Sequence, residues 1–140
     1  MMRLLFSTAI LCFLTGSAAA DSKSGDVKFT GPRKESVKVS VGDKLKVDVV
    51  LEQIDVGNQT AVSVGGTIKN TSGTKMNYSY HVAFLDKSKN LIGCQNFNLF
   101  VDGGKEGRVG TFINLPPEEI AKIAYYTIVF YESEKPIGSR

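Results

Sequence analysis

The fold is decided by Met76-Asn77-Tyr78-Ser79-Tyr80-His81-Val82-Ala83-Phe84-Leu85, a run in which large apolar side chains alternate with smaller or polar ones. A period of two is typical of a β-strand that buries one face, because successive side chains point to opposite sides of the sheet. The second face, which includes Asn77, Ser79 and His81, is the less apolar one. We therefore expect residues 76–85 to form a central strand of an antiparallel sheet.

The same period recurs before this run. Residues 37–41 and 45–51 alternate on either side of Gly42-Asp43, which predicts a half-buried hairpin. Residues 62–68 predict the next strand, and this strand contains the unusual pair Gly65-Gly66. Glycine inside a strand marks a bulge or a close approach by another backbone. The alternative interpretation is that a ligand occupies the space left by the missing side chains.

The pattern continues after the central strand. Residues 91–101 return through the turn Asp86–Asn90, but their apolar positions change from even to odd numbers. One extra residue would reconcile the two halves, so we expect a bulge near Gln95-Asn96. Further strands are expected over 109–115 and 123–131.

One short helical turn is expected near Pro116 to Lys122. Prolines open this segment and two glutamates would lie in its first turn, where the helix dipole favours acids. About seven strands at regular spacing, with almost no helix, favour an all-β fold. The leading architecture is an immunoglobulin-like antiparallel β-sandwich.

The N-terminus has the layout of a secretory signal peptide. Arg3 precedes an apolar run over 4–14, and Ala18-Ala19-Ala20 forms a small-x-small cleavage site before Asp21. We expect removal of residues 1–20 and a periplasmic or secreted protein with no transmembrane segment after cleavage. A lipid anchor on Cys12 is the alternative, but bulky Leu11 stands where a lipidation motif needs a small residue.

After the signal peptide the chain is expected to form one domain. Residues 21–26 are polar and predict a disordered lead-in, residues 27–135 the sandwich, and residues 136–140 a tail. A first strand is possible around Val27 to Phe29.

The charge excludes two classes of partner. The formal net charge is +3 and the cationic residues are spread along the chain. A nucleic-acid surface would concentrate lysine and arginine on one element, and a membrane-surface helix would need a basic amphipathic segment. We therefore expect neither nucleic-acid nor membrane-surface binding.

Cys94 is the only cysteine left after cleavage, so no intramolecular disulfide can form. Its place within a strand predicts a small buried hydrophobe. The alternatives are a reactive thiol or an intermolecular disulfide.

Three segments carry a resemblance to a known family. They are Val64-Gly65-Gly66-Thr67-Ile68-Lys69-Asn70-Thr71-Ser72, Tyr80-His81-Val82-Ala83-Phe84-Leu85-Asp86 and Leu91-Ile92-Gly93. Together they resemble the FxLYD-type module of bacterial envelope and secreted proteins. The resemblance implies an immunoglobulin-like sandwich of accessory or unknown role, with no catalytic residues to carry over.

The sequence offers little metal or cofactor chemistry. His81 is the only histidine, and with Met76 it makes a poor copper site, since copper proteins gather more such ligands. Asp86, Ser88 and Asn90 have the spacing of a calcium loop, but lysines separate them and no bidentate glutamate follows. We expect a polar hairpin turn there, and no metal or cofactor.

Three glycosylation sequons occur, at Asn58, Asn70 and Asn77. In a eukaryotic host the first two, in turns, would be plausible sites, and Asn77 in a strand less so. The signal sequence looks bacterial, which would make all three chance occurrences.

Two functional hypotheses from different classes follow. The first is an exported, non-catalytic module that binds another protein or an envelope component through a sheet face or an edge strand. Its exposed candidates are His81, the loop that starts at Asp86, and Tyr126. Its oligomeric state is left open.

The second hypothesis is a small carbohydrate-active or hydrolytic protein. It would use Asp86 or Asp102 in a sheet-face cleft, beside aromatic residues such as Tyr78, Tyr80 and Tyr125. Such chemistry needs two carboxyl groups that converge on one bond.

Overall fold

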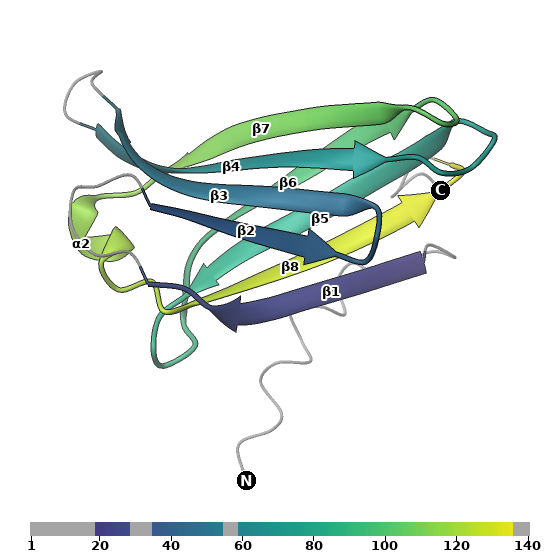
Figure 1. Cartoon of the computed structure of the whole chain (residues 1–140). Coiled ribbons are helices and arrows are strands. Elements are labelled where there is room, and N and C mark those ends of the chain that lie inside the picture. Colours follow the sequence, from purple (N-terminus) through teal and green to yellow (C-terminus); the bar gives the residue numbers. More distant parts are fainter. Residues whose placement is uncertain (1–18, 29–34, 55–58, 136–140) are drawn as a thin grey trace, which may run out of the picture.

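The computed structural model describes residues 19–28, 35–54 and 59–135. These residues form two four-stranded antiparallel sheets that pack face to face (Figure 1). Sheet A has the order β1 (Ala19–Asp26), β8 (Tyr125–Ser133), β5 (Met76–Leu85), β6 (Leu91–Val101). Sheet B has the order β2 (Glu35–Val41), β3 (Leu45–Ile54), β4 (Gln59–Lys69), β7 (Glu106–Asn114). The predicted all-β sandwich is confirmed.

The predicted helical turn is also present. α2 (Pro117–Ile120) links β7 to β8, with Pro116 at its N-cap and Glu118 and Glu119 in its first turn. Ile120 is buried and anchors the turn to the core.

The core lies between the sheets and follows the period-two pattern. β5 occupies the centre of sheet A, between β8 and β6, and its inward side chains are fully buried. Tyr78 stacks on Phe130 of β8 at 5.5 Å between ring centroids, and Tyr80 stacks on Phe97 of β6 at 4.7 Å. The opposite wall of the core comes from the inward faces of β3 and β4, namely Leu45, Val47, Val49, Val62, Val64 and Ile68.

The predicted disordered lead-in is wrong. Residues 21–26 belong to β1, which pairs with β8 along its whole length, from Ala19 opposite Glu132 to Asp26 opposite Tyr125. Backbone hydrogen bonds to the edge of β8 hold this polar segment, so side-chain hydrophobicity gives no indication of it. With β1, the described residues form eight strands. The possible strand over Val27 to Phe29 is not formed as such: Val27 is buried in the core, and Phe29 lies outside the described residues.

The bulge in β6 lies elsewhere than predicted. The register with β5 shifts between Phe84, opposite Gly93, and Leu85, opposite Leu91, so that Ile92 is the extra residue. From Gly93 onward the odd-numbered residues face the core. Cys94 is therefore exposed on the outer face and is not the buried hydrophobe expected from the sequence.

The two glycines of β4 point to opposite faces, and only Gly66 lies in a crowded place. The register with β3 and β7 runs through Gly65 and Gly66 without a bulge. Gly66 faces the core, where an added Cβ would lie 3.1 Å from the Tyr80 hydroxyl oxygen. Gly65 faces outward, directly opposite Gly110 of β7. A side chain and not another backbone therefore explains the close approach at Gly66.

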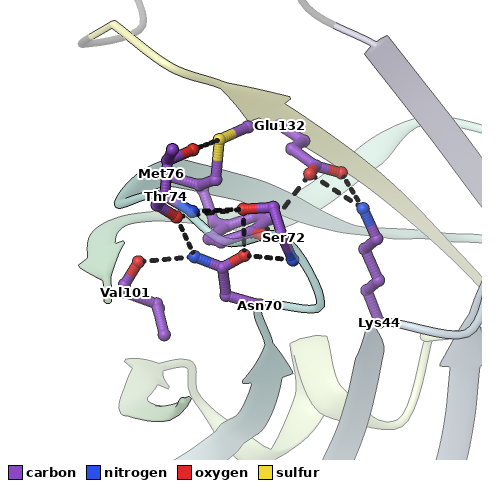
Figure 2. Close-up of polar contacts among 8 residues, drawn as sticks. Lys44, Asn70, Ser72, Thr74, Met76, Val101 and Glu132 are labelled. Atoms are coloured by element: carbon purple, nitrogen blue, oxygen red, sulfur yellow. Dashed lines mark hydrogen bonds and ion pairs between the residues drawn. The ribbon is translucent and has the colours of Figure 1, made fainter. Parts of the chain in front are cut away.

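Polar contacts at one end of the sandwich fasten loops to strands (Figure 2). The Asn70 amide nitrogen donates to the carbonyls of Thr74 and Val101, each at 2.8 Å, and its oxygen accepts from the backbone N–H and hydroxyl of Ser72 at 2.9 and 2.7 Å. This buried side chain joins the β4–β5 connection to the end of β6.

A second contact in Figure 2 ties the two sheets together. The Lys44 ammonium, in the turn before β3, donates to both carboxylate oxygens of Glu132 on β8, at 2.8 and 2.6 Å. The Tyr78 hydroxyl donates to the same carboxylate at 3.4 Å. Burial and the nearby negative charge of Glu132 raise the pKa of Tyr78 to about 12, so this hydroxyl stays protonated.

Candidate functional site

The three predicted surface residues do not form one surface. His81 lies on the outer face of β5, with its ring edge-on to Tyr131 at 5.7 Å between centroids. Partial burial lowers the pKa of His81, since desolvation disfavours the charged imidazole. Tyr126 is only 8% exposed and belongs to the core, so it is not the exposed candidate that the sequence suggested. Its side chain points inward because side chains along β8 alternate between the two faces of the sheet, and those of the residues next to Tyr126 point outward.

Asp86 closes the turn between β5 and β6. One carboxylate oxygen accepts from the backbone N–H groups of Ser88 and Asn90 at 2.8 and 2.9 Å, and the other accepts from the Asn90 amide at 3.1 Å. These hydrogen bonds, above all that from the backbone of Asn90, lower the pKa of Asp86. Lys89 adopts a left-handed φ of 67° and places its ammonium 2.8 Å from the centroid of the Tyr125 ring. The loop is a capped polar turn, as its lysines indicated.

Asp86 and Asp102, the two acids of the second hypothesis, do not converge on one site. Asp86 precedes and Asp102 follows the eleven-residue strand β6, so their backbones lie on the order of 30 Å apart at the usual rise of a strand. Tyr78 and Tyr80 are fully buried in the core, and Tyr125 lies beneath Lys89. The described part of the chain also holds no cluster of three or more His, Cys, Asp or Glu side chains that could bind a metal ion.

Two of the sequons carry buried asparagines. Asn70 is fully buried and its amide is engaged in the contacts of Figure 2. Asn77 is fully buried and donates to the Asn98 side chain across β5 and β6. The expectation that Asn70 is a plausible glycosylation site in a turn is therefore wrong for the folded chain, while Asn58 lies outside the described residues.

A feature that the sequence analysis did not single out is the composition of β6. Each sheet has two edge strands, and within the described residues these are β1 and β6 in sheet A and β2 and β7 in sheet B. β6 is eleven residues long and contains no charged residue and no proline. The other three edge strands all carry charges: Asp21, Lys23 and Asp26 in β1, Glu35 and Lys38 in β2, Glu106 and Arg108 in β7.

The exposed side of β6 is uncharged throughout. Cys94, Asn96 and Asn98 are exposed on the outer face of sheet A. Leu91 and Phe100, near the two ends of the strand, are 61% and 47% exposed. An edge strand of this length normally carries charges or proline, which prevent another strand from pairing with it. We call the backbone of Leu91–Val101 that faces away from β5 the β6 edge.

The core is only partly closed beside the β6 edge. Strands β6 and β7 lie along the same side of the sandwich without pairing with each other (Figure 1). Between them lies what we call the seam, a set of half-buried apolar side chains that pack against the core: Ile92, Phe97, Leu99, Val109, Ile113 and Leu115.

Glycines let the two strands approach at both ends of the seam. An added Cβ on Gly107 would lie 2.6 Å from Leu99 Cδ2, and one on Gly93 would lie 3.3 Å from Ile113 Cγ2. A Cβ at Gly107 would clash with the Leu99 and Val101 side chains, whereas one at Gly93 would make a tight contact with Ile113.

The opposite side of the sandwich is protected differently. There β1 and β2 lie side by side, and the positions of β1 opposite core residues Phe130 and Ile128 are Asp21 and Lys23. Both charged side chains are exposed. Charges that point toward the core side of an edge strand oppose the addition of another strand. Strand addition is therefore disfavoured at β1, whereas β6 has no charged residue of its own to oppose it.

The arrangement at the β6 edge suits binding by strand addition. A free edge offers backbone N–H and C=O groups, and an added strand would bring side chains over the half-buried residues of the seam. The absence of charge over 91–101 is visible in the sequence, but the sequence does not reveal that this strand lies at an edge. Within the described residues, no helix has the length and apolar character needed to cross a membrane.

No protein-family model and no curated protein matches the chain. Among solved structures, it is similar to a chain from the structure of infectious bursal disease virus Gx strain, with a TM-score of 0.45 and 10% identity, over 85% of this chain and 29% of that one. A DUF1425 family member from Shewanella sp. pv-4 has a TM-score of 0.37 and 18% identity, over 75% of this chain and 94% of that one.

The enzymatically active domain of tailspike protein 4 from Bacteriophage CBA120 has a TM-score of 0.30 and 13% identity, over 82% of this chain and 17% of that one. The chain thus spans less than a third of the viral chain and of the tailspike chain. At these identities the likeness concerns the fold alone, and the assignment as a β-sandwich rests on the strand pairing.

Proposed function

We propose that this chain is an exported, non-catalytic β-sandwich module that binds another protein through strand addition at the β6 edge. The observation that carries the proposal is an uncharged, eleven-residue edge that pairs with no further strand among the described residues, together with the half-buried apolar side chains beside it. Export is supported by the signal-peptide layout of residues 1–20, and an accessory role by the resemblance to FxLYD-type modules.

Strand addition would supply two kinds of stabilisation. Each backbone hydrogen bond formed in place of one to water contributes about 1 kcal/mol. Each Å² of apolar surface removed from water in the seam contributes roughly 25 cal/mol. A partner segment that alternates apolar and polar residues would gain both, since its apolar side chains would lie over Phe97 and Leu99.

Site-specific photo-crosslinking tests the binding surface. A photoreactive amino acid replaces Asn98 on β6 and, as the control, Ser40 on edge strand β2, and both side chains are exposed. In the native host we expect a crosslinked protein from position 98 that is absent from position 40. Identical products from the two positions, or no product from position 98, would contradict the proposal.

The mass of the mature protein tests the proposal that the chain is exported and cleaved. Cleavage after Ala20 predicts a chain that begins with Asp21, released from cells that express the full-length gene. Intact-protein mass spectrometry of the periplasmic and secreted fractions measures this. Recovery of only the uncleaved chain, inside the cell, would show that the protein is not exported.

A further inference from the structure

We propose that the strand added at the β6 edge is β6 of a second copy of this chain, related to the first by a two-fold axis. The inference rests on the proposed function, because it names the partner for the same edge. It would join two copies of sheet A into one continuous eight-stranded sheet.

Charge favours a second copy at β6 above the other edges. In a two-fold contact the same surface appears on both sides, so every charge on the strand enters the interface twice. Burying an unpaired charge is costly, and like charges directly opposite each other destabilise a strand pair. Within the described chain, β6 is the only edge strand that brings no charge of its own into such an interface.

Geometry makes β6 compatible with itself in every regular two-fold register. In a regular two-fold antiparallel pair, opposite residues are both odd-numbered or both even-numbered, because opposite side chains point to the same face and the faces alternate along each strand. From Gly93 to Val101 the odd-numbered residues face the core and the even-numbered ones face outward. Two copies would therefore always present matching faces.

The side chains that meet are suited to the environment they would enter. On the core side, Phe97 and Leu99 of both copies would lie together beside the seam and lose their remaining exposure. On the outer face, a register centred on Phe97 would place Asn96 of each copy opposite Asn98 of the other. Each amide can both donate and accept a hydrogen bond, although the Asn98 oxygen already accepts one from Asn77. Neither face would contain a charged residue of β6 itself, and the nearby Lys75 ammonium lies over the Phe100 ring, 5.6 Å from its centroid, near one end of the strand.

The oligomeric state of the exported protein tests the inference. Light scattering after gel filtration, under reducing conditions, should give twice the mass of one chain. Asn96→Lys, which places an ammonium near the axis on each copy, should raise the dissociation constant at least about tenfold. Ser40→Lys on β2 is the matched control and should leave the dimer unchanged, since it adds the same charge to another exposed edge strand.

A spin label on Cys94 provides a measurement that needs no disruptive variant. Cys94 is exposed and is a free cysteine on the outer face of β6. Strand rise and spacing place the two labels within about 25 Å of each other in a β6–β6 dimer. A label at Ser40→Cys in a Cys94→Ser background should give a clearly longer distance.

The outcomes separate the inference from the proposed function. A wild-type protein that is monomeric at all concentrations, an Asn96→Lys variant that stays dimeric, or Cys94 labels as distant as those at position 40 would overturn the second-copy inference. If position 98 nevertheless crosslinks to a different protein, the proposed function stands. If position 98 crosslinks to nothing, both fall.

Discussion

At the scale of single residues, Tyr80 and Gly66 form a coupled pair in the core. The Tyr80 hydroxyl is buried against Gly66 and has no hydrogen-bond partner among the described residues. Burial raises the pKa of Tyr80, so the group stays neutral. An unpaired buried hydroxyl reduces stability, and the absence of a Cβ at Gly66 is what lets it fit.

We expect Gly66→Ala to lower the free energy of unfolding by about 1–3 kcal/mol, because its Cβ would lie too close to the hydroxyl. Tyr80→Phe should leave stability unchanged or raise it by about 1 kcal/mol. In a Tyr80→Phe background, Gly66→Ala should lower the free energy of unfolding by at least about 0.5 kcal/mol less than it does in the wild type. Urea unfolding of the wild type, the two single variants and the double variant measures these free energies. If the two effects are additive, the Tyr80 hydroxyl is not the reason that glycine is required at position 66.

His81 predicts a pH dependence of stability. Its pKa in the folded protein lies below the ordinary value of 6.5 because of desolvation. As the pH falls from about 6.5 toward the folded-state pKa, the unfolded chain binds a proton that the folded chain resists, so stability decreases. Well above pH 6.5 the imidazole is neutral in both states and the histidine contributes no slope.

We expect His81→Gln to flatten the stability curve in this window, measured by urea unfolding across a pH series. Asp86 also has a lowered pKa, so its stabilising effect is present above its unfolded-state pKa and is lost as the pH falls, in a more acidic range. Asp86→Asn should therefore leave the window near 6.5 unaffected. If the slope of the unfolding free energy against pH is unchanged in the His81 variant, this histidine is not the source of the pH dependence.

At the scale of elements, Asn70 holds the connection between the sheets. The chain leaves sheet B at the end of β4 and enters sheet A at β5, and the Asn70 side chain supports that crossing with hydrogen bonds to three residues. Asn70→Ala would leave the buried carbonyl of Val101 without this partner, whereas the exposed Thr74 carbonyl would keep its hydrogen bond from the Ser72 hydroxyl. We expect a loss of roughly 2–4 kcal/mol in the free energy of unfolding.

Thr71→Ala is the control for this change, since Thr71 is the exposed neighbour in the same turn. Thermal unfolding should separate the two variants clearly. Equal melting temperatures would mean that the turn forms without the asparagine.

The predictability of each element followed from what stabilises it. Strands β2 to β5 were predicted because each buries one face, which leaves a period of two in the sequence. β1 was missed because its backbone, and not its side chains, holds it to β8. Cys94 was placed on the wrong face because Ile92 is the bulged residue and Gln95 is not.

The candidate site was less accessible to sequence reasoning. The uncharged run 91–101 can be read directly, but its meaning depends on strand order. Pairing of β5 with β6 follows from the short turn between them, but pairing of β5 with β8 is a long-range choice that no local pattern encodes.

At the scale of the whole molecule, the two sides of the sandwich differ in how their edges are protected. On one side the charges of β1 discourage a further strand, and on the other the neutral β6 edge lies beside half-buried apolar side chains. β1 is itself a strand added to the edge of β8, and its removal would create a second unprotected edge. The stability of the molecule therefore depends on a segment that looks dispensable in the sequence.

Comparing the chain 21–140 with the chain 27–140 tests this dependence. A disordered lead-in would make the two equally stable, whereas loss of β1 would uncover Tyr126, Ile128 and Phe130 on β8, which are now buried. For each of these side chains that becomes largely exposed, the free energy of unfolding falls by about 1–2 kcal/mol. The unpaired edge of β8 can also pair with strands of other chains. We expect the shorter chain to melt at a markedly lower temperature and to scatter light on standing, while the longer chain stays clear. Identical melting curves and equally clear solutions would show that β1 contributes nothing to the fold.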